Sequence, residues 1–236
     1  MPTLPRSATL HIASGEHTAF TTIVFDVDGT LIDSNGAHAD AYVEALRVHG
    51  RHADPLHVRR LIGMGSDKVL PELAGVAEDS PLGQSIGQHK KDLFAKRLPA
   101  LRPTRGARPL VQFLRDRGLD LVIATSAGSD ELRALLEQAD VADLIPERTS
   151  KDDADASKPE PDIVQAALAK VEADSATSVM VGDTPYDLEA AARAGIIAVA
   201  LRCGGFWPDE AFAGAAGIFD DPAALLDHWR SHSSHR

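Results

Sequence analysis

Apolar residues in the second half of the chain form short unbroken runs, such as LVIA, VMV and IIAVA, separated by segments in which they recur every three or four positions. Unbroken runs bounded by turn residues are typical of strands buried on both faces of a parallel sheet, and the wider spacing is typical of helices. Strands that alternate with helices indicate parallel strands joined by helical crossovers, hence a doubly wound α/β sheet. The pattern predicts strands over 119–124, 178–181 and 196–201, and helices over 107–117, 129–138, 161–171, 185–194 and from Pro222 onward.

The first half of the chain opens with one comparable run and then changes character. β-Branched and aromatic residues over 21–27, ended by Asp-Gly, predict a first buried strand. From residue 35 to about 105 the apolar spacing is helical throughout, so this stretch predicts a small all-helical insert. The expected helices are 35–49, one with Asp54 as N-cap and Pro55 in its first turn that ends at Gly63, one capped by Ser66, and one from about Ser85 to Leu98.

Composition narrows the possible partners. Of the 236 residues, 44% are hydrophobic and 25% are charged, which is enough apolar material for a sizeable core. The 35 acidic residues outnumber the 24 basic ones, giving a net charge of −11, whereas a duplex-binding protein needs a basic surface, so nucleic acid is not an expected partner. The single cysteine, Cys203, excludes an intramolecular disulfide and a cysteine-based zinc cluster and favours a reducing, cytoplasmic compartment.

No segment resembles a targeting signal or a membrane span. Residues 1–20 carry a single Arg and no apolar run of signal-peptide length. No stretch approaches the roughly 18 apolar residues that a membrane-spanning helix needs, so no membrane association is expected. The His-rich tail, 231–236, is expected to be a solvated chain end.

Polar side chains follow three of the predicted strands. Asp26 and Asp28 come at the end of the first, Thr125 and Ser126 follow the second, and Asp183 follows the third. One such junction would be uninformative, because Asp and Ser are common turn formers. Three of them, in a sheet that gathers the carboxyl ends of its strands, predict a ligand site at that edge.

The acids at this edge predict a cation. Because side chains alternate along an extended chain, Asp26 and Asp28 are expected on the same side, a few ångströms apart, where they repel each other. Asp183 and Asp187 add two more carboxylates within VGDTPYD. Four acids without a His or Cys partner describe an oxygen-only site, which suits Mg²⁺. The alternative is a set of acids that only form turns.

Four motifs in order resemble those of the haloacid dehalogenase superfamily, in the branch of phosphoglycolate phosphatase-like and β-phosphoglucomutase-like proteins. They are FDVDGTL at 25–31, VIATS at 122–126, SKPEPD at 157–162 and VGDTPYD at 181–187. The resemblance extends from Thr21 to about Arg230 and implies a Rossmann-like doubly wound parallel sheet core with an inserted small all-helical cap domain. The implied domains are an N-terminal extension, 1–20, a catalytic core, 21–35 and 106–236, and a cap, 36–105.

The resemblance also implies roles for the acids. Asp26 would be the nucleophile that takes the phosphoryl group as an aspartyl-phosphate. Asp28 would be the general acid for the leaving alcohol and then the general base for water, while its backbone carbonyl binds the metal. Asp26 and Asp183 would bind Mg²⁺ through their side chains, and Asp187 would act from the metal's outer shell.

Four further residues receive implied roles. Thr125 and the backbone N–H of Ser126 would bind the phosphoryl oxygens, and Lys158 would balance the carboxylate charge and hold Asp26 and phosphate in register. His38 has two interpretations: related sugar-phosphate enzymes often carry a His that faces the site here, but the residue could equally face solvent from its helix.

The expected function is a Mg²⁺-dependent phosphatase that hydrolyses a small soluble phosphomonoester through an aspartyl-phosphate. A phosphosugar mutase and a pyrophosphatase would share this chemistry and stay open as alternatives, as does a non-catalytic protein on the same scaffold. A true dehalogenase is disfavoured, because expelling halide needs neither the acid Asp28 nor the Asp183–Asp187 pair. The expected partner is a small phosphorylated metabolite, and the sequence leaves the oligomeric state open.

Overall fold

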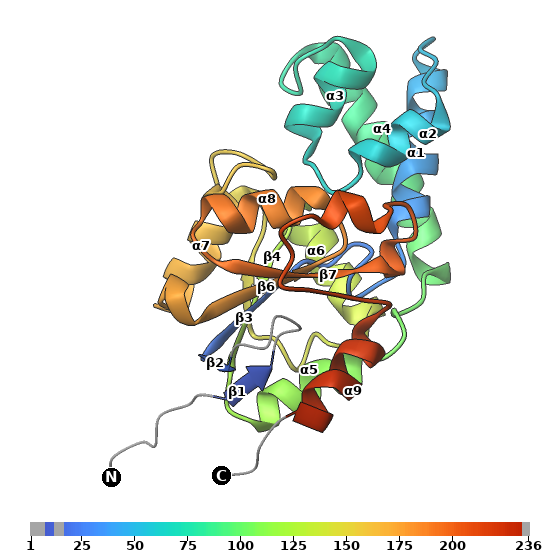
Figure 1. Ribbon diagram of the computed structural model, residues 1–236. Helices are drawn as coiled ribbons and strands as arrows, with labels where there is room; N and C mark the ends of the chain where they lie inside the picture. The colour runs from blue at the N-terminus through green and yellow to red at the C-terminus, as the bar shows by residue number, and fades with distance from the viewer. Residues whose placement is uncertain (1–7, 12–16, 233–236) are drawn as a thin grey trace.

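A six-stranded, all-parallel sheet forms the centre of the computed structural model, which describes residues 8–11 and 17–232 (Figure 1). In space the strands follow the order β5-β4-β3-β6-β7-β8, so the chain runs outward in one direction from β3 and then returns to build the other half. This is the doubly wound sheet that the sequence predicts. The strands are β3 (Thr22–Phe25), β4 (Asp120–Ala124), β5 (Glu147–Thr149), β6 (Ser178–Gly182), β7 (Ile197–Leu201) and β8 (Gly217–Phe219).

Helices cover both faces of the sheet because successive strand residues point to opposite sides. Ile23 and Phe25 of β3 are fully buried in one hydrophobic cluster, and Val24 between them is fully buried in the other. Most helical members of the first cluster come from α5, α6 and α9, and those of the second come from α7 and α8. These helices span α5 (Ala107–Asp116), α6 (Ser129–Gln138), α7 (Asp162–Lys170), α8 (Pro185–Arg193) and α9 (Pro222–His232).

Four further helices form a separate layer at one end of the sheet (Figure 1). They bury an apolar cluster of their own, which includes Leu46, Val58 and Leu70. The two chain segments that join this layer to the sheet lie side by side, because the N–H of Asp33 donates to the carbonyl of Arg102 over 2.9 Å. The helices are α1 (Asn35–Val48), α2 (Pro55–Leu61), α3 (Ser66–Ala74) and α4 (Pro81–Arg97).

Two helix starts differ from the prediction. Gly65 rather than Ser66 occupies the N-cap of α3, and the Ser66 hydroxyl instead donates to Glu78 over 2.5 Å. Helix α4 begins at Pro81, four residues before the predicted start, because the Ser80 hydroxyl accepts from the N–H of Gly83 and Pro81 fits the first turn.

The shortest strands were missed by the sequence pattern. Strands β5 and β8 have three residues each, and β5 exposes Glu147 and contains Arg148, so neither produces an apolar run. Within the stretch expected as an N-terminal extension, β1 (Ala8–His11) pairs antiparallel with β2 (His17–Phe20). Residues 1–7, 12–16 and 233–236, with most of the expected solvated tail, lie outside the described residues.

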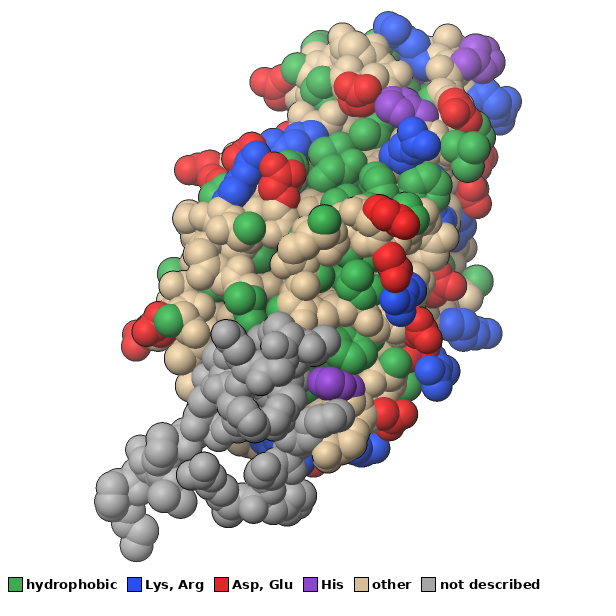
Figure 2. All heavy atoms as spheres, viewed as in Figure 1, with side chains coloured by type: hydrophobic (Ala, Val, Ile, Leu, Met, Phe, Trp, Pro, Cys, Tyr) green, Lys and Arg blue, Asp and Glu red, His purple; other side chains and the backbone are tan. Residues whose placement is uncertain are grey.

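Short 3₁₀ segments complete the elements, and the surface mixes both charges. They are Leu98–Ala100, Lys151–Asp153, Ser175–Thr177, Arg202–Gly204 and Asp209–Phe212. On the face seen in Figure 2, acidic and basic side chains are interspersed, and hydrophobic side chains gather where the helical layer meets the sheet layer. Among the helices of the described residues, none combines the length and apolarity required to cross a membrane.

Candidate active site

The polar strand ends predicted from the sequence meet at one edge of the sheet. Strand β3 pairs with β4 on one side and with β6 on the other, in parallel register. Asp26 directly follows β3, Thr125 follows β4 and Asp183 follows β6. The carboxyl ends of these three strands lie where the chain reverses its winding direction, which is where ligands bind in sheets of this type.

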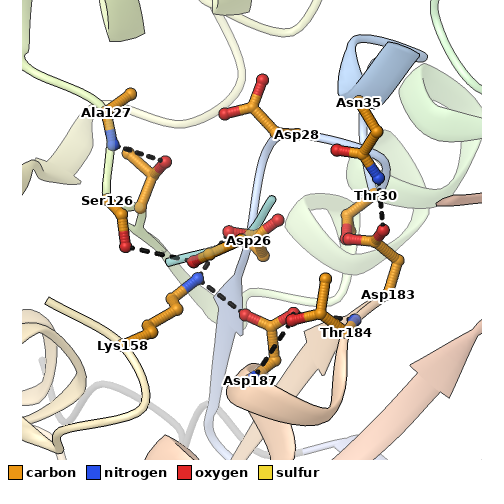
Figure 3. A network of polar contacts seen from close by, with 12 residues as sticks. Asp26, Asp28, Thr30, Asn35, Ser126, Ala127, Lys158, Asp183, Thr184 and Asp187 are labelled. Carbon is orange, nitrogen blue, oxygen red and sulfur yellow. Dashed lines mark hydrogen bonds and ion pairs between the residues drawn. The ribbon is translucent and has the colours of Figure 1, made fainter. Parts of the chain in front are cut away.

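A fully buried lysine ties two of the acids together. The Nζ of Lys158 lies 2.5 Å from Oδ1 of Asp26 and 2.7 Å from Oδ1 of Asp187, and the three side chains point toward one another in Figure 3. Burial by itself lowers the pKa of Lys158, but the neighbouring Asp187 and Asp26 outweigh it, so the net shift is upward. Lys158 is therefore a permanent cation at the floor of the site.

Three carboxylates at this floor are arranged to share a cation. Asp26, Asp183 and Asp187 each offer an oxygen, and these oxygens lie within 4.8 Å of one another. Within the described part of the chain, Lys158 is the one ammonium that is ion-paired with this group, so three negative charges face one positive charge. A divalent cation would balance the remainder, and an all-oxygen donor set suits a hard ion of this kind.

The pKa values of Asp26 and Asp183 are raised, in keeping with this excess of carboxyl groups. Burial, opposed by Lys158 and reinforced by the nearby Asp187 and Asp28, raises the pKa of Asp26 to about 7. Burial also raises the pKa of Asp183 well above its ordinary value, with the charges of Asp26 and Asp187 adding to the effect. Without a cation the floor therefore tends to hold protons, and a bound divalent metal would displace them.

Hydrogen bonds fix the orientation of Asp183 (Figure 3). The Thr30 hydroxyl donates to its Oδ1 over 3.0 Å, and the Asn35 amide donates to its Oδ2 over 2.8 Å. The backbone at Gly29 approaches this carboxylate so closely that a Cβ there would lie 2.2 Å from Oδ2 of Asp183. Gly29 also has a φ of 76°, so both the space and the backbone conformation require glycine.

Asp187 is held by the first turn of its own helix. Thr184 caps α8, and its N–H and hydroxyl donate to Oδ2 of Asp187 over 3.0 and 2.7 Å. This reciprocal arrangement is a capping box, which stabilises the start of α8. The same bonds leave Oδ1 of Asp187 directed at Lys158.

Asp28 has a different environment from the other acids. Its Oδ1 accepts a hydrogen bond of 2.5 Å from the Ser34 hydroxyl and lies 2.8 Å from Nε2 of His38. Its carboxylate points away from Lys158 and Asp187 in Figure 3. Burial by itself raises the pKa of Asp28, but the charge and hydrogen bond of His38 and the hydrogen bond of Ser34 outweigh it, so the net shift is downward.

His38 faces the site, so the solvent-facing interpretation was wrong. The residue is buried in α1, and its ring stacks on Phe94 of α4 with 3.8 Å between ring centroids. This stacking and the contact with Asp28 fix both ends of the imidazole. Its role as a substrate contact stays a prediction.

Thr125 and Ser126 line the same cavity from the end of β4. The hydroxyl of Thr125 accepts from the N–H of Ala127 over 3.2 Å, which fixes the turn. The hydroxyl of Ser126 donates to the carbonyl of Gly63 in the helical layer over 3.3 Å. The predicted phosphate contacts therefore lie at the junction of the sheet and the helical layer.

A cavity of about 950 Å³ extends from these residues into the helical layer. Asp26 and Asp28 line its floor, and α4 together with the loop of residues 62–66 lines its far wall. The charged groups therefore lie at one end of a large cavity that can hold a ligand.

Several residues of the site were not identified from the sequence. Thr30 lies inside the first motif, and Thr184 with Asp187 forms the S/T-x-x-D/E signature of a helix start, so both carried a usable signal. Asn35 and Ser34 carried none, because single polar residues at a helix start are usually caps. Here Ser34 is the N-cap of α1, but its side chain makes no cap hydrogen bond. Its hydroxyl donates to Asp28 instead.

Comparisons with known proteins identify the family. A model described as haloacid dehalogenase-like hydrolase matches residues 23–201. A phosphoglycolate phosphatase of Caulobacter vibrioides is 30% identical over 206 residues, which are 84% of this chain and 83% of the relative. A probable phosphatase, IndB, of Dickeya dadantii is 28% identical over 203 residues, 84% of this chain and 88% of the relative.

A solved structure extends the similarity to the fold. A hydrolase from Pseudomonas syringae superposes with a TM-score of 0.84 at 29% identity and covers 91% of this chain and all of its own. The matched residues include all four motifs and the acids at the carboxyl ends of the strands. The chain therefore belongs to the haloacid dehalogenase-like hydrolase family.

Proposed function

We propose that this site hydrolyses the phosphomonoester of a small metabolite in two steps, with the phosphoryl group carried on Asp26 between them. The protein is a phosphatase of its family, like the phosphatases of Caulobacter vibrioides and Dickeya dadantii reported above. The observation that carries the proposal is a buried carboxylate, Asp26, which lines the cavity with one oxygen 2.5 Å from a buried ammonium.

In the first step Asp26 attacks phosphorus and the ester P–O bond breaks. Lys158 holds Oδ1 of Asp26 and fixes the direction of the other carboxylate oxygen. Thr125 and the N–H of Ser126 bind phosphoryl oxygens at the edge of the same cavity. Asp28 donates a proton to the leaving oxygen, which departs as a neutral alcohol.

In the second step water attacks the phosphorus, the bond to Asp26 breaks, and phosphate leaves. Asp28 takes the proton of the attacking water, which requires its carboxylate form. Its lowered pKa in the free site favours that form. A phosphoryl group that arrives beside Asp28 raises the pKa of this carboxyl, because like charges oppose ionisation, so the same residue can serve as the acid in the first step.

Phosphatases of this family generally use a divalent metal, and the cluster of Asp26, Asp183 and Asp187 fits one. We propose Mg²⁺ as that ion, with the Asp28 backbone carbonyl as a further ligand and Asp187 in the outer shell. When bound, it would neutralise charge that develops on the phosphoryl group. Thr30, Asn35 and Thr184 orient the acids for it.

We also propose that residues 36–105 act as a cap over the core, 21–35 and 106–236. The two linking segments are hydrogen-bonded to each other, so they can bend as a pair. Contacts such as the 2.7 Å hydrogen bond from the Tyr186 hydroxyl to the carbonyl of Arg60 hold the layers together. Closure would exclude water during the first step. A cytoplasmic location stays our proposal, on the single cysteine of the chain.

The experiment is a phosphate-release assay with p-nitrophenyl phosphate and a panel of phosphorylated metabolites. We expect turnover with Mg²⁺ that a chelator abolishes and that Asp26→Asn lacks. Phosphate release that survives both the chelator and Asp26→Asn would overturn the proposal, as would the absence of turnover on every ester.

The mutase and pyrophosphatase alternatives have less support. Both would use the same aspartyl-phosphate, and neither is favoured by a residue of the described site. A mutase would isomerise a sugar phosphate without net phosphate release when a sugar bisphosphate is supplied. A pyrophosphatase would release phosphate from pyrophosphate faster than from any ester of the panel.

A further inference from the structure

The cavity beyond Asp26 is much larger than a phosphoryl group needs. At about 950 Å³ it lies near the upper end of the range of roughly 300–1,000 Å³ that is usual for small-molecule pockets. Its far wall presents polar uncharged side chains, such as Gln84, Gln88 and Ser66, beside the rings of Tyr42 and Phe94. This wall is where the alcohol part of a phosphomonoester would lie.

Lys90 is the most buried lysine of this wall, and an acid already neutralises it. Its ammonium lies 3.4 Å from the carboxylate of Glu131 in α6. It also sits over the rings of Phe94 and Tyr42, 5.0 and 5.5 Å from their centroids. Because Lys90 is 9% exposed, this pair is largely removed from water.

Lys151, which lines the cavity from the core side, also has an acidic neighbour. Lys151 lies 2.5 Å from the carboxylate of Glu78 and donates to the Ser66 hydroxyl over 3.0 Å. The third lysine of the lining, Lys91 of α4, is exposed. Two of the three lysines that line the cavity, Lys90 and Lys151, are therefore ion-paired with a carboxylate.

This pairing decides what the wall can accept. To bind either of these two lysines, a second anionic group on the substrate would have to take Lys90 from Glu131 or Lys151 from Glu78, and would leave that carboxylate unpaired in a partly desolvated place. Lys91 is exposed, and an ion pair in water contributes only about 0–1 kcal/mol. Hydroxyl groups carry no charge and can donate to the carboxylates while they accept from the amides and ammoniums. The rings of Tyr42 and Phe94 offer apolar surface for carbon–hydrogen faces.

On the basis of the proposed phosphatase function, we propose that the substrate is the phosphomonoester of a neutral, hydroxyl-rich alcohol of at least sugar size, and that Glu131 and Glu78 exclude leaving groups with a second negative charge. The relative from Caulobacter vibrioides is named for phosphoglycolate, whose leaving group carries a carboxylate. We therefore expect this chain to disfavour phosphoglycolate.

Two matched pairs of esters test the charge and the size of the leaving group. Glucitol 6-phosphate and gluconate 6-phosphate differ by a terminal CH₂OH against a carboxylate, and 2-hydroxyethyl phosphate and phosphoglycolate differ in the same way at small size. We expect kcat/KM to be about tenfold or more higher for the neutral member of each pair, the effect of one charge-assisted contact. Glucitol 6-phosphate should also exceed 2-hydroxyethyl phosphate.

The variant Glu131→Gln tests the source of this selectivity. It frees Lys90, so the preference for glucitol 6-phosphate over gluconate 6-phosphate should fall by about tenfold. Because both esters are measured on one preparation, the ratio does not depend on how much of the variant is folded. Glu137→Gln is the matched control, since Glu137 is exposed on the same helix and does not line the cavity. Glu78→Gln provides a second, independent release of a lysine.

The outcomes separate this inference from the proposed function. If no ester is hydrolysed, including p-nitrophenyl phosphate, the phosphatase function fails and the inference with it. If esters are hydrolysed but gluconate 6-phosphate or phosphoglycolate equals or exceeds its neutral partner, the function stands and the inference is wrong. Turnover of p-nitrophenyl phosphate with neither sugar ester accepted also overturns it. If Glu131→Gln and Glu78→Gln both keep the ratio of the control, the assignment of selectivity to these acids is wrong.

Discussion

The floor of the cavity and its far wall use charged residues in opposite ways. At the floor, the completely buried Lys158 is ion-paired with Asp26 and Asp187, and Asp183 lies beside them, so the carboxyl groups outnumber the ammonium. At the wall, Lys90 and Lys151 each face one carboxylate across the boundary between the two layers, so charge is balanced. We therefore expect the unbalanced floor to bind a cation and a phosphoryl group and the balanced wall to select by shape and hydrogen bonding. On these proposals the chemistry and the selectivity of the site come from different regions.

Removal of the nucleophile from the floor should have the largest effect on turnover. Asp26→Asn should reduce turnover to background, because no other described carboxylate of the floor combines access to the cavity with a lysine at 2.5 Å. Intact-mass measurement after rapid quench should find no added phosphoryl group. A phosphoryl adduct on this variant would place the nucleophile elsewhere.

Substitution of Asp28 should remove only the proton transfers of the reaction. Asp28→Asn should lower kcat by roughly 10²–10⁴-fold with an alkyl phosphate. An aryl phosphate has a good leaving group, so its first step should survive in part while the second step lacks a base. Phosphorylated enzyme should then accumulate and appear as one added phosphoryl group in the intact mass. Equal residual rates for Asp28→Asn and Asp26→Asn would contradict the separate roles.

Binding of a metal ion at the acids of the floor should stabilise the folded protein. A ligand that binds only the folded state stabilises it by about 2.7 kcal/mol at one hundred times its Kd, so Mg²⁺ should raise the Tm of the chelator-treated protein. The pKa of Asp26 is raised from 3.8 to about 7, so the folded state binds protons that the unfolded state releases. The contribution of Asp26 to the free energy of unfolding of the metal-free protein is therefore lost as the pH rises from 3.8 to about 7.

This pH dependence sharpens the same measurement. Mg²⁺ should displace the protons, so the gain in Tm should be larger at pH 8 than at pH 5.5. Na⁺ at equal ionic strength serves as the control for general charge screening. A gain in Tm that is the same at both pH values, or that Na⁺ reproduces, would argue against a site at these acids.

The two regions also differ in how far the sequence predicts them. Asp26, Asp183 and Thr125 could be placed together because each follows a parallel strand, and parallel strands bring their carboxyl ends to one edge. Lys158 was identified through its motif, and its contact with both Asp26 and Asp187 needed the structure. The central strands were predicted because they are apolar and buried on both faces, whereas β5 and β8 are too short to form a pattern.

The wall was hidden because its contacts join distant segments. Glu131 is 41 residues from Lys90, and Glu78 is 73 residues from Lys151. On a sequence each looks like an ordinary charged surface residue, because nothing local distinguishes a lysine that meets an acid across a cavity from one that faces solvent. His38 was undecided for the same reason until its stacking on Phe94 was seen.

The same substitution of a lysine in each region should have a large effect at the floor and the smallest effect of all at the wall. Lys158→Met leaves the buried Asp26 and Asp187 without their ammonium, and the loss of one partner of a buried ion pair costs about 3–5 kcal/mol. Lys151→Met removes a pair whose side chains are 30% and 36% exposed, and such pairs contribute about 0–1 kcal/mol. Both variants are measured by denaturant unfolding in chelator, so that metal binding does not mask the difference. Lys151→Met should also keep its turnover of p-nitrophenyl phosphate within a few-fold of the unmodified protein while Lys158→Met loses it, because Lys151 lies at the wall and the aryl group needs no hydroxyl contacts there. Equal losses of stability in the two variants would show that the wall is as deeply charge-coupled as the floor, and the distinction between the two regions would fail.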